Sequence, residues 1–294
     1  MNIKKAALKV AEIIATLFLI GVGLFALYVI LIIFVYTPVT VPTTSMLPGI
    51  QAGDKIIVEK VSGGARLYDI FEAAAGKRTD IRRTPHWRRF RRDDVLVFNF
   101  VHRGSWDTLT MNYHVHYIKR CIAAPGDTVA ISGFRYIVNG DTLSRYPEPD
   151  LFARSYPPDS VCRAENLRGY MADVSDTLDR WTIRDFGPLV VPRAGMTLPL
   201  DPANCRRYRQ IIERETEASL ECADSIVRLD GNPLTRYTFK ENYYFMAGDN
   251  ALASMDSRYW GLVPEDFIVG RAAFIWWSAN DNGIQWRRIF KSVK

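Results

Sequence analysis

A lysine stands on the apolar face of a strand-like segment at residues 113–123. Side chains along a strand point alternately to its two faces, so Lys119 shares a face with Tyr117 and Cys121. Burial of an ammonium group is costly and lowers the lysine pKa, which makes the neutral amine available as a general base. A half-buried lysine can also reach solvent or pair with a carboxylate for purely structural reasons. Lys119 therefore becomes a candidate base only if a nucleophile lies beside it.

A serine between two prolines supplies a candidate nucleophile. Residues 41–49 read Val-Pro-Thr-Thr-Ser-Met-Leu-Pro-Gly, and Pro42 and Pro48 fix backbone angles on either side of Ser45. A serine hydroxyl is a poor nucleophile until a neighbouring base removes its proton. Serines in proline-flanked loops usually cap turns, so Ser45 by itself indicates no chemistry.

A polar loop at residues 248–258 is the third segment of interest, with the sequence Gly-Asp-Asn-Ala-Leu-Ala-Ser-Met-Asp-Ser-Arg. Asp256 and Arg258 are two residues apart, and an ion pair between them could brace the loop. The same residues also suit a turn with a surface ion pair, which contributes only about 0–1 kcal/mol. The spacing alone does not decide between these interpretations.

The elements that must position these residues begin with an apolar run. Residues 13–36 are 24 residues whose one polar member is Thr16, and as a helix they reach about 36 Å, enough for one tilted membrane span. A cleaved signal peptide is disfavoured, because its apolar region runs about 7–15 residues and no small-x-small site closes this run. Three lysines precede the run, at positions 4, 5 and 9. The positive-inside rule therefore predicts a cytoplasmic segment 1–12, a single-pass anchor 13–36 and an extracytoplasmic, periplasmic remainder.

The exported remainder is predicted to be mainly β. Branched and aromatic runs at residues 54–61, 94–101 and 115–123 are typical of strands. The tail at residues 284–290 is predicted to form a final strand. Its aromatic residues, with Trp276 nearby, also fit an anchor at the membrane interface.

The texture of the sequence changes at residues 145–225, which are rich in proline and charge. We expect an inserted α+β lobe there, between two parts of an all-β core at residues 37–144 and 226–294. Asp201 and Pro202 predict the start of a helix that runs to about Leu220.

Composition excludes several classes of protein. Hydrophobic residues are 48% and charged residues 24%, which is ordinary for a packed globular chain and not for a disordered or collagen-like one. The net charge is +6, yet residues 77–92 alone carry eight bases and one acid. The rest of the chain sums to −1, so a uniformly basic nucleic-acid-binding fold is disfavoured. The basic stretch 77–92 fits either a solvated loop or a contact with an anionic membrane surface.

Cysteine and histidine usage adds two expectations. The four cysteines are Cys121, Cys162, Cys205 and Cys222, in a compartment that permits disulfides. Cys121 lies in an apolar strand and is expected to be a small buried residue. At most two of the other three can pair with each other, and the sequence does not choose among the pairings. His114 and His116 share a strand face but have no attached acidic cluster, so we expect no metal and no cofactor.

Taken in order, these segments resemble the sequence boxes of type I signal peptidases, the Ser/Lys leader peptidases. The boxes that carry the resemblance follow the apolar run in the order Ser45-Met46-Leu47-Pro48, Arg92-Asp93-Asp94-Val95, Lys119-Arg120-Cys121-Ile122-Ala123-Ala124-Pro125-Gly126-Asp127, and the loop 248–258. One box would be weak evidence, whereas four in order behind an anchor are specific. The chain departs from the family pattern at Gly49-Ile50, Asp93 and residues 251–253, and Thr43 stands where serine is common.

The resemblance implies a role for each matching residue. Ser45 would attack the scissile carbonyl, and Lys119 would be its general base. Ser254 would hydrogen-bond the Lys119 amine. The Ser45 amide and the Thr43 hydroxyl would form the oxyanion hole. Asp256 and Arg258 would hold the loop that carries Ser254.

The function implied is a membrane-anchored serine endopeptidase. It would remove signal peptides from exported preproteins after small residues at −1 and −3, with the lipid bilayer and the preproteins as partners and no nucleic acid. One rival is a Ser/Lys protease with another task, either a self-cleaving repressor-type peptidase or a processor of one dedicated precursor. The other rival is a non-enzymatic anchored scaffold whose lobe binds a partner.

Overall fold

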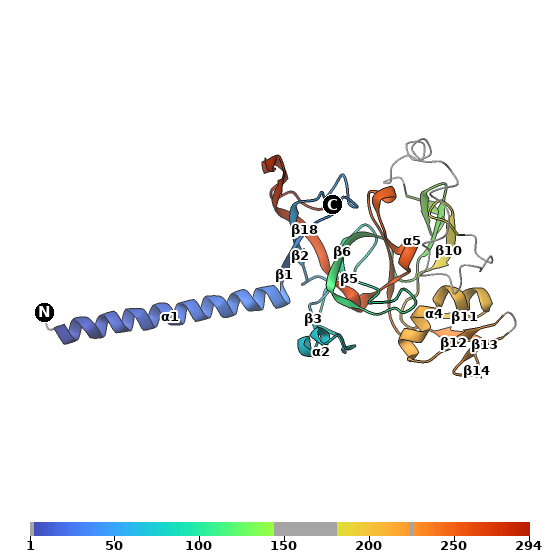
Figure 1. The fold of residues 1–294 in the computed structure, drawn as a ribbon, viewed down its shortest axis with the longest axis horizontal. Helices are drawn as coiled ribbons and strands as arrows, with labels where there is room; N and C mark the ends of the chain where they lie inside the picture. Colours follow the sequence, from blue (N-terminus) through green and yellow to red (C-terminus); the bar gives the residue numbers. More distant parts are fainter. Residues whose placement is uncertain (1–2, 144–180, 224–225) are drawn as a thin grey trace.

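The computed structural model describes residues 3–143, 181–223 and 226–294 (Figure 1). A long N-terminal helix projects from a β-rich body. The helices are α1 (Ile3–Phe34), α2 (Ile70–Ala74), α4 (Pro202–Thr216), α5 (Ser257–Trp260), and the 3₁₀ turns η2 (Ala251–Ala253), η3 (Glu265–Phe267) and η4 (Trp286–Arg288). The strands are β1 (Tyr36–Thr40), β2 (Asp54–Glu59), β3 (Arg66–Leu67), β4 (Arg82–Arg83), β5 (Val95–Phe100), β6 (Asn112–Ala123), β7 (Thr128–Ser132), β8 (Arg135–Val138), β9 (Asp141–Thr142), β10 (Phe186–Val190), β11 (Thr197–Pro199), β12 (Leu220–Cys222), β13 (Val227–Leu229), β14 (Asn232–Pro233), β15 (Arg236–Thr238), β16 (Tyr243–Ala247), β17 (Val263–Pro264), β18 (Ile268–Asn280) and β19 (Gly283–Ile284).

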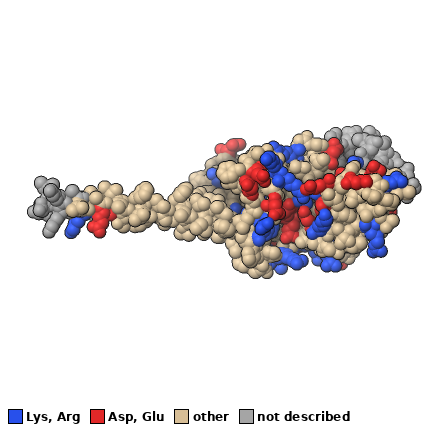
Figure 2. Space-filling model, turned by 90° about the horizontal axis from the view of Figure 1, so that it is seen from below, with Lys and Arg blue, Asp and Glu red and all other residues tan. Residues whose placement is uncertain are grey.

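Helix α1 contains a 27-residue segment, Leu8–Phe34, that is long and apolar enough to cross a membrane. Figure 2 shows no charged side chains along α1 between its N-terminal end and the body. The helix ends at Phe34, two residues before the predicted end of the anchor, because Tyr36 pairs with Glu59 and begins β1. Lys60 Nζ donates to the carbonyl oxygen of Ile32 at 2.7 Å, so a cation stabilises the negative end of the helix dipole.

One large antiparallel sheet carries the candidate site. Its strand order is β1-β2-β18-β5-β6-β16-β17, and β19 pairs with β18. Strand β6 pairs with β5 along most of its length and with β16 only near residues 120–123. Among the described strands, none pairs with the second edge of β6 over residues 112–119, and β1, a terminal strand of the sheet, also has one unpaired edge.

Apolar side chains fill both faces of this sheet. One cluster includes Val41, Ile56, Val97, Ile118 and Ile275, which join the end of β1 to β2, β5, β6 and β18. The mainly β prediction is confirmed. Burial alternates along β2, where one side is buried and the other half-buried, whereas β5 is buried on both sides.

A smaller sheet, β10-β7-β8-β9, and helix α4 lie on the side of the body away from α1 (Figure 1). The Asp201 carboxylate accepts the Asn204 N–H at 2.7 Å, which confirms the predicted helix start. The predicted end at about Leu220 is wrong, because Glu217 adopts a left-handed conformation with φ 57° and Leu220 begins β12.

Cys205 forms a disulfide with Cys222, and this bond ties α4 to β12. Cys121 is buried and free, as expected of a small apolar residue in a strand. Cys162 and residues 144–180 of the predicted lobe lie outside the described residues, so the domain boundaries at 144–145 and 225–226 stay a prediction.

The tail contains less strand than predicted. Of residues 284–290, only Ile284 lies in a strand, the short β19 (Gly283–Ile284), and Trp286–Arg288 is a 3₁₀ turn. The physical reason is Arg288, whose guanidinium turns inward to bond the Asp54 carboxylate and the Gly49 carbonyl. Trp286 remains exposed, so the alternative of an interfacial anchor stays open.

Candidate active site

Ser45 and Lys119 meet in the interior of the body although 74 positions separate them. Lys119 Nζ donates to Ser45 Oγ at 2.7 Å and to the carbonyl oxygen of Ile118 at 3.0 Å. Lys119 is 3% exposed and Ser45 is 5% exposed. A nucleophile and a base in this geometry can exchange a proton directly, because their heavy atoms lie within hydrogen-bond reach.

Burial prepares Lys119 to act as a base. Removal from water disfavours the ammonium form and lowers the pKa of Lys119 from 10.5 to about 8. The Asp256 carboxylate raises this pKa, the Arg258 guanidinium lowers it, and Asp249 raises it, so burial remains the dominant cause. A substantial share of neutral amine therefore exists near neutral pH.

Local structure explains why the two residues face each other. Strand β6 directs Lys119 to the same side as Tyr117, and Lys119 Nζ lies 5.3 Å from the centre of the Tyr117 ring. Backbone hydrogen bonds hold the loop that carries Ser45 at Val41 and at Ser45 itself. Val41 N–H donates to the Asp54 carbonyl at 2.9 Å, and Asn250 N–H donates to the Ser45 carbonyl at 3.0 Å.

Thr43 and the Ser45 amide lie where an oxyanion could be stabilised. The hydroxyl oxygens of Thr43 and Ser45 are 3.4 Å apart. Within the described part of the chain, the Ser45 N–H makes no hydrogen bond, so it is available as a donor. A backbone amide and a hydroxyl beside the nucleophile are the groups that an oxyanion hole needs.

The loop 248–258 is held by a buried ion pair. Asp256 and Arg258 are 0% and 1% exposed, and Arg258 Nε donates to Asp256 Oδ1 at 2.8 Å. Arg258 also donates to the carbonyl oxygen of Ala251 at 2.6 Å. The pair therefore lies in the interior, unlike the surface pair that the spacing alone also allowed.

Ser254 is buried, but its hydroxyl bonds a different group from the Lys119 amine that the family resemblance implied. Its hydroxyl donates to Asp256 Oδ2 at 2.7 Å. Among the described residues, the hydrogen bonds of the Lys119 amine go to Ser45 and Ile118. A carboxylate oxygen is a stronger hydrogen-bond acceptor than an amine nitrogen, which explains this choice of partner.

Gly248 marks a close approach between the two loops. A side chain at this position would collide with Ser254 Oγ and with the carbonyl oxygen of Ser45. The Gly248 N–H donates to Asp256 Oδ2 at 3.0 Å. Glycine at this position therefore lets the loop 248–258 pack against the loop of Ser45.

Two further ion pairs support the site and were not assigned from the sequence. Arg120 binds Asp249 through two hydrogen bonds of 2.7 and 2.6 Å, on the strand face opposite to Lys119. Arg288 binds Asp54 in the same bidentate way, at 3.0 and 2.6 Å. Burial raises the pKa of Asp54, but its hydrogen bonds outweigh that effect and the pKa is lowered. The position of Arg120 next to Lys119 could have marked it as a residue of the site. No sequence signal marks the pair of Arg288 and Asp54, because these residues are far apart in the chain.

Among the described residues, no group of three or more His, Cys, Asp or Glu side chains is placed to hold an ion. His116 instead lies 3.4 Å from the Asn99 amide nitrogen. The absence of a metal and of a cofactor stays a prediction.

Comparison with known proteins supplies the family. Residues 12–277 match the sequence model of the family described as signal peptidase, peptidase S26. The chain belongs to this family. It is accordingly a serine peptidase of the signal peptidase family, as its sequence boxes indicated.

Relatives in this family cover most of the chain. Signal peptidase I of Buchnera aphidicola from Acyrthosiphon pisum is 27% identical over 263 residues, which are 86% of this chain and 72% of that protein. Signal peptidase I of Pseudomonas aeruginosa is 28% identical and covers 87% of this chain and 70% of its own length. That of Helicobacter pylori strain 26695 is 24% identical and covers 92% of this chain and 90% of its own length. A solved signal peptidase I from Enterococcus faecalis is 21% identical, covers 63% of this chain and 97% of its own length, and superposes with a TM-score of 0.27.

Proposed function

We propose that the chain is a membrane-anchored endopeptidase that removes signal peptides from exported preproteins, with Ser45 as nucleophile and Lys119 as general base. The observation that carries this proposal is the buried 2.7 Å hydrogen bond between Lys119 Nζ and Ser45 Oγ. The apolar helix α1 and the family support the membrane anchor.

The reaction would proceed in two steps. Neutral Lys119 takes the Ser45 proton as Oγ attacks the scissile carbonyl, and the Ser45 N–H and the Thr43 hydroxyl stabilise the oxyanion. The resulting ammonium group protonates the leaving amine, which leaves an ester on Ser45. Lys119 then activates a water molecule that hydrolyses this ester.

The two open sheet edges suggest how a signal peptide binds. Val41, just after β1, and Ile118, on β6, belong to one apolar cluster, so these edges converge beside Ser45. An extended peptide can add a strand to such an edge. Alternate side chains of that peptide point the same way, so residues −1 and −3 would both face the apolar walls. Shallow pockets in these walls would favour small side chains at positions −1 and −3 of the peptide.

The orientation of the anchor is part of the proposal. Three lysines precede the apolar run and keep the N-terminus in the cytoplasm under the positive-inside rule. The peptidase body then lies on the periplasmic side. Ser45 follows the end of α1 by only a short segment, which keeps the nucleophile close to the membrane surface where cleavage sites emerge.

The test is cleavage of several unrelated preproteins by the detergent-solubilised full chain. We expect one cut after a small-x-small sequence, and loss of cleavage in Ser45→Ala and in Lys119→Met. Matched controls are Ser62→Ala and Lys60→Met, because Ser62 is also buried and the pKa of Lys60 is also lowered to about 8. Unchanged cleavage by Ser45→Ala would exclude Ser45 as the nucleophile. Cleavage of one precursor alone would indicate a dedicated processing enzyme.

A further inference from the structure

An arm beside the end of α1 has no part in the peptidase site. The arm comprises residues 66–89, which include β3, α2, β4 and the segment that follows. It contains much of the basic stretch 77–92 and exposes four large apolar side chains. These are Leu67 at 41%, Ile70 at 64%, Phe71 at 80% and Trp87 at 76% exposure. Solvated loops rarely expose so many large apolar groups together, so this surface needs a partner.

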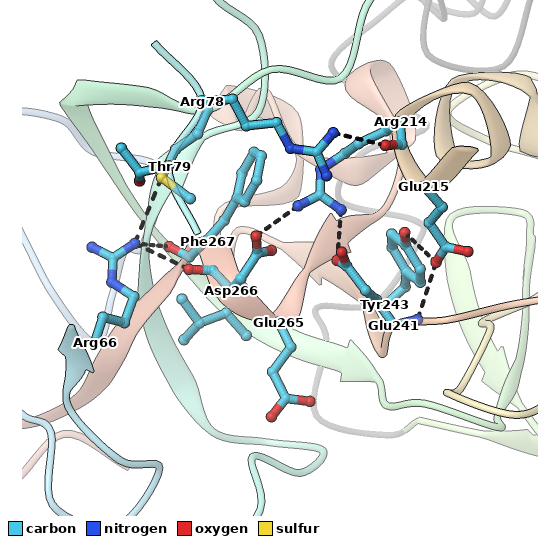
Figure 3. A network of polar contacts seen from close by, with 12 residues as sticks. Arg66, Arg78, Thr79, Arg214, Glu215, Glu241, Tyr243, Glu265, Asp266 and Phe267 are labelled. Atoms are coloured by element: carbon cyan, nitrogen blue, oxygen red, sulfur yellow. Dashed lines mark hydrogen bonds and ion pairs between the residues drawn. The ribbon is translucent and has the colours of Figure 1, made fainter. Parts of the chain in front are cut away.

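The inner face of the arm is fixed to the body. Arg66 and Arg83 are cross-strand partners. Arg66 donates to the carbonyl oxygens of Asp266 and Phe267, both at 3.2 Å, and Figure 3 shows this side chain reaching them. Arg83 donates to the carbonyl oxygen of Ile268 at 2.6 Å. The arm therefore has one defined orientation, and its outer face cannot turn inward.

The outer face combines apolar and basic groups. Leu67 pairs with Arg82 across the two strands, so both point away from Arg66 and Arg83. The Arg82 side chain is 83% exposed, and Lys77 and Arg89 are also exposed. The acids of the arm are Asp69, Glu72 and Asp80. Asp69 caps α2, and Asp80 pairs with Arg82. Arg78 and Arg88 pair with Glu217 and Asp94 of the body, so Lys77 and Arg89 carry the basic excess of the outer face.

Hydrogen bonds place this face at the level where α1 joins the body. Arg88 N–H donates to the Ser62 carbonyl at 3.2 Å, and Ser62 N–H donates to the Glu59 carboxylate at 3.1 Å. Glu59 pairs in the sheet with Tyr36, which stands two residues beyond α1. Figure 1 shows β3 and α2 next to the C-terminal end of α1. A bilayer spanned by α1 therefore ends beside the arm.

We propose that the outer face of the arm is a second membrane contact, which binds the anionic headgroups of the leaflet from which α1 emerges. Aromatic side chains favour the headgroup level, and bases are attracted to an anionic surface there. The proposal rests on the membrane anchoring proposed above and not on the cleavage chemistry. Two contacts, α1 and the arm, hold the body in one orientation, whereas a single tether would let it rotate. The open edges of β1 and β6 would then keep a constant orientation relative to the membrane surface.

The test measures depth in the membrane at the arm of the full chain. Ala74→Cys places a bimane label on the exposed side of α2, and Cys162→Ser is present in every variant. The chain is reconstituted in nanodiscs of phosphatidylcholine alone or with phosphatidylglycerol, each containing doxyl-labelled lipid as quencher. The matched control label is Asn232→Cys on β14, which lies far from α1 in Figure 1.

We expect strong quenching at position 74 in anionic nanodiscs, weaker quenching in zwitterionic ones, and none at position 232. Lys77→Gln with Arg89→Gln should lower the ratio of docked to undocked arm about 25-fold, since each base near such a surface contributes about five-fold. Arg135→Gln with Arg236→Gln, on β8 and β15, should not change it. Equal quenching at positions 74 and 232, or no dependence on anionic lipid, would overturn the proposal. Quenching does not require cleavage, so its failure is distinguishable from a failure of the proposed activity.

Discussion

The pH dependence of cleavage tests the assignment of Lys119 most directly. Burial lowers the pKa of this amine from 10.5 to about 8. Only the neutral amine can accept the Ser45 proton, so the reactive fraction increases as the pH rises. We expect kcat/KM to rise with pH through about 8 and to level off above it.

The size of the effect follows from the shift. At pH 7, about one Lys119 amine in ten is neutral when its pKa is about 8, but roughly one in 3000 when its pKa is 10.5. Burial therefore increases the reactive fraction about 300-fold at neutral pH. Most of this increase in the neutral fraction is lost if water enters the site beside Lys119, because hydration stabilises the ammonium form.

The assay is kcat/KM for a preprotein between pH 6 and 11, with thermal unfolding measured at each pH. Lys60→Met is the matched control, because the pKa of Lys60 is also lowered to about 8 while its amine bonds the Ile32 carbonyl. The profile of this variant should match that of the wild type. A rise centred near 10.5 would refute burial as the activating cause. A rise that disappears in Lys60→Met would refute the assignment to Lys119.

Two further predictions concern the surroundings of the nucleophile. Thr43→Val should lower kcat about 100–1000-fold through loss of one oxyanion donor, while Thr43→Ser keeps the hydroxyl and most of the rate. Equal rates for the two variants would exclude the Thr43 hydroxyl as an oxyanion donor. Gly248→Ala should abolish most cleavage, because the added methyl group collides with Ser254 and Ser45, whereas Gly49→Ala meets only ordinary contacts and should retain activity. Cleavage assays beside thermal unfolding separate loss of the site from loss of the fold, and an active Gly248→Ala would contradict the close packing of the two loops.

Local patterns in the sequence predicted several features because they depend on near neighbours. Strand alternation placed Lys119 on an apolar face, and it is buried in β6. An aspartate before a proline predicted the start of α4 at Pro202. The end of the same helix was mispredicted, since the left-handed Glu217 and the pairing of β12 with β13 stop it earlier. The position at which α4 ends depends on the pairing of β12 with β13, and local helix propensity does not encode that pairing.

By itself, the sequence determined the apolar anchor, the mainly β class and the family boxes, because each is a property of residues close together in the chain. The tertiary structure alone decided which groups touch. It brought Ser45 within 2.7 Å of Lys119, gave Ser254 the Asp256 carboxylate as its acceptor, and paired Arg288 with Asp54. It also selected Cys222 as the partner of Cys205. Ser45 and Lys119, like Arg288 and Asp54, belong to segments that only the folding of the sheet brings together, so no spacing along the chain specifies these two contacts.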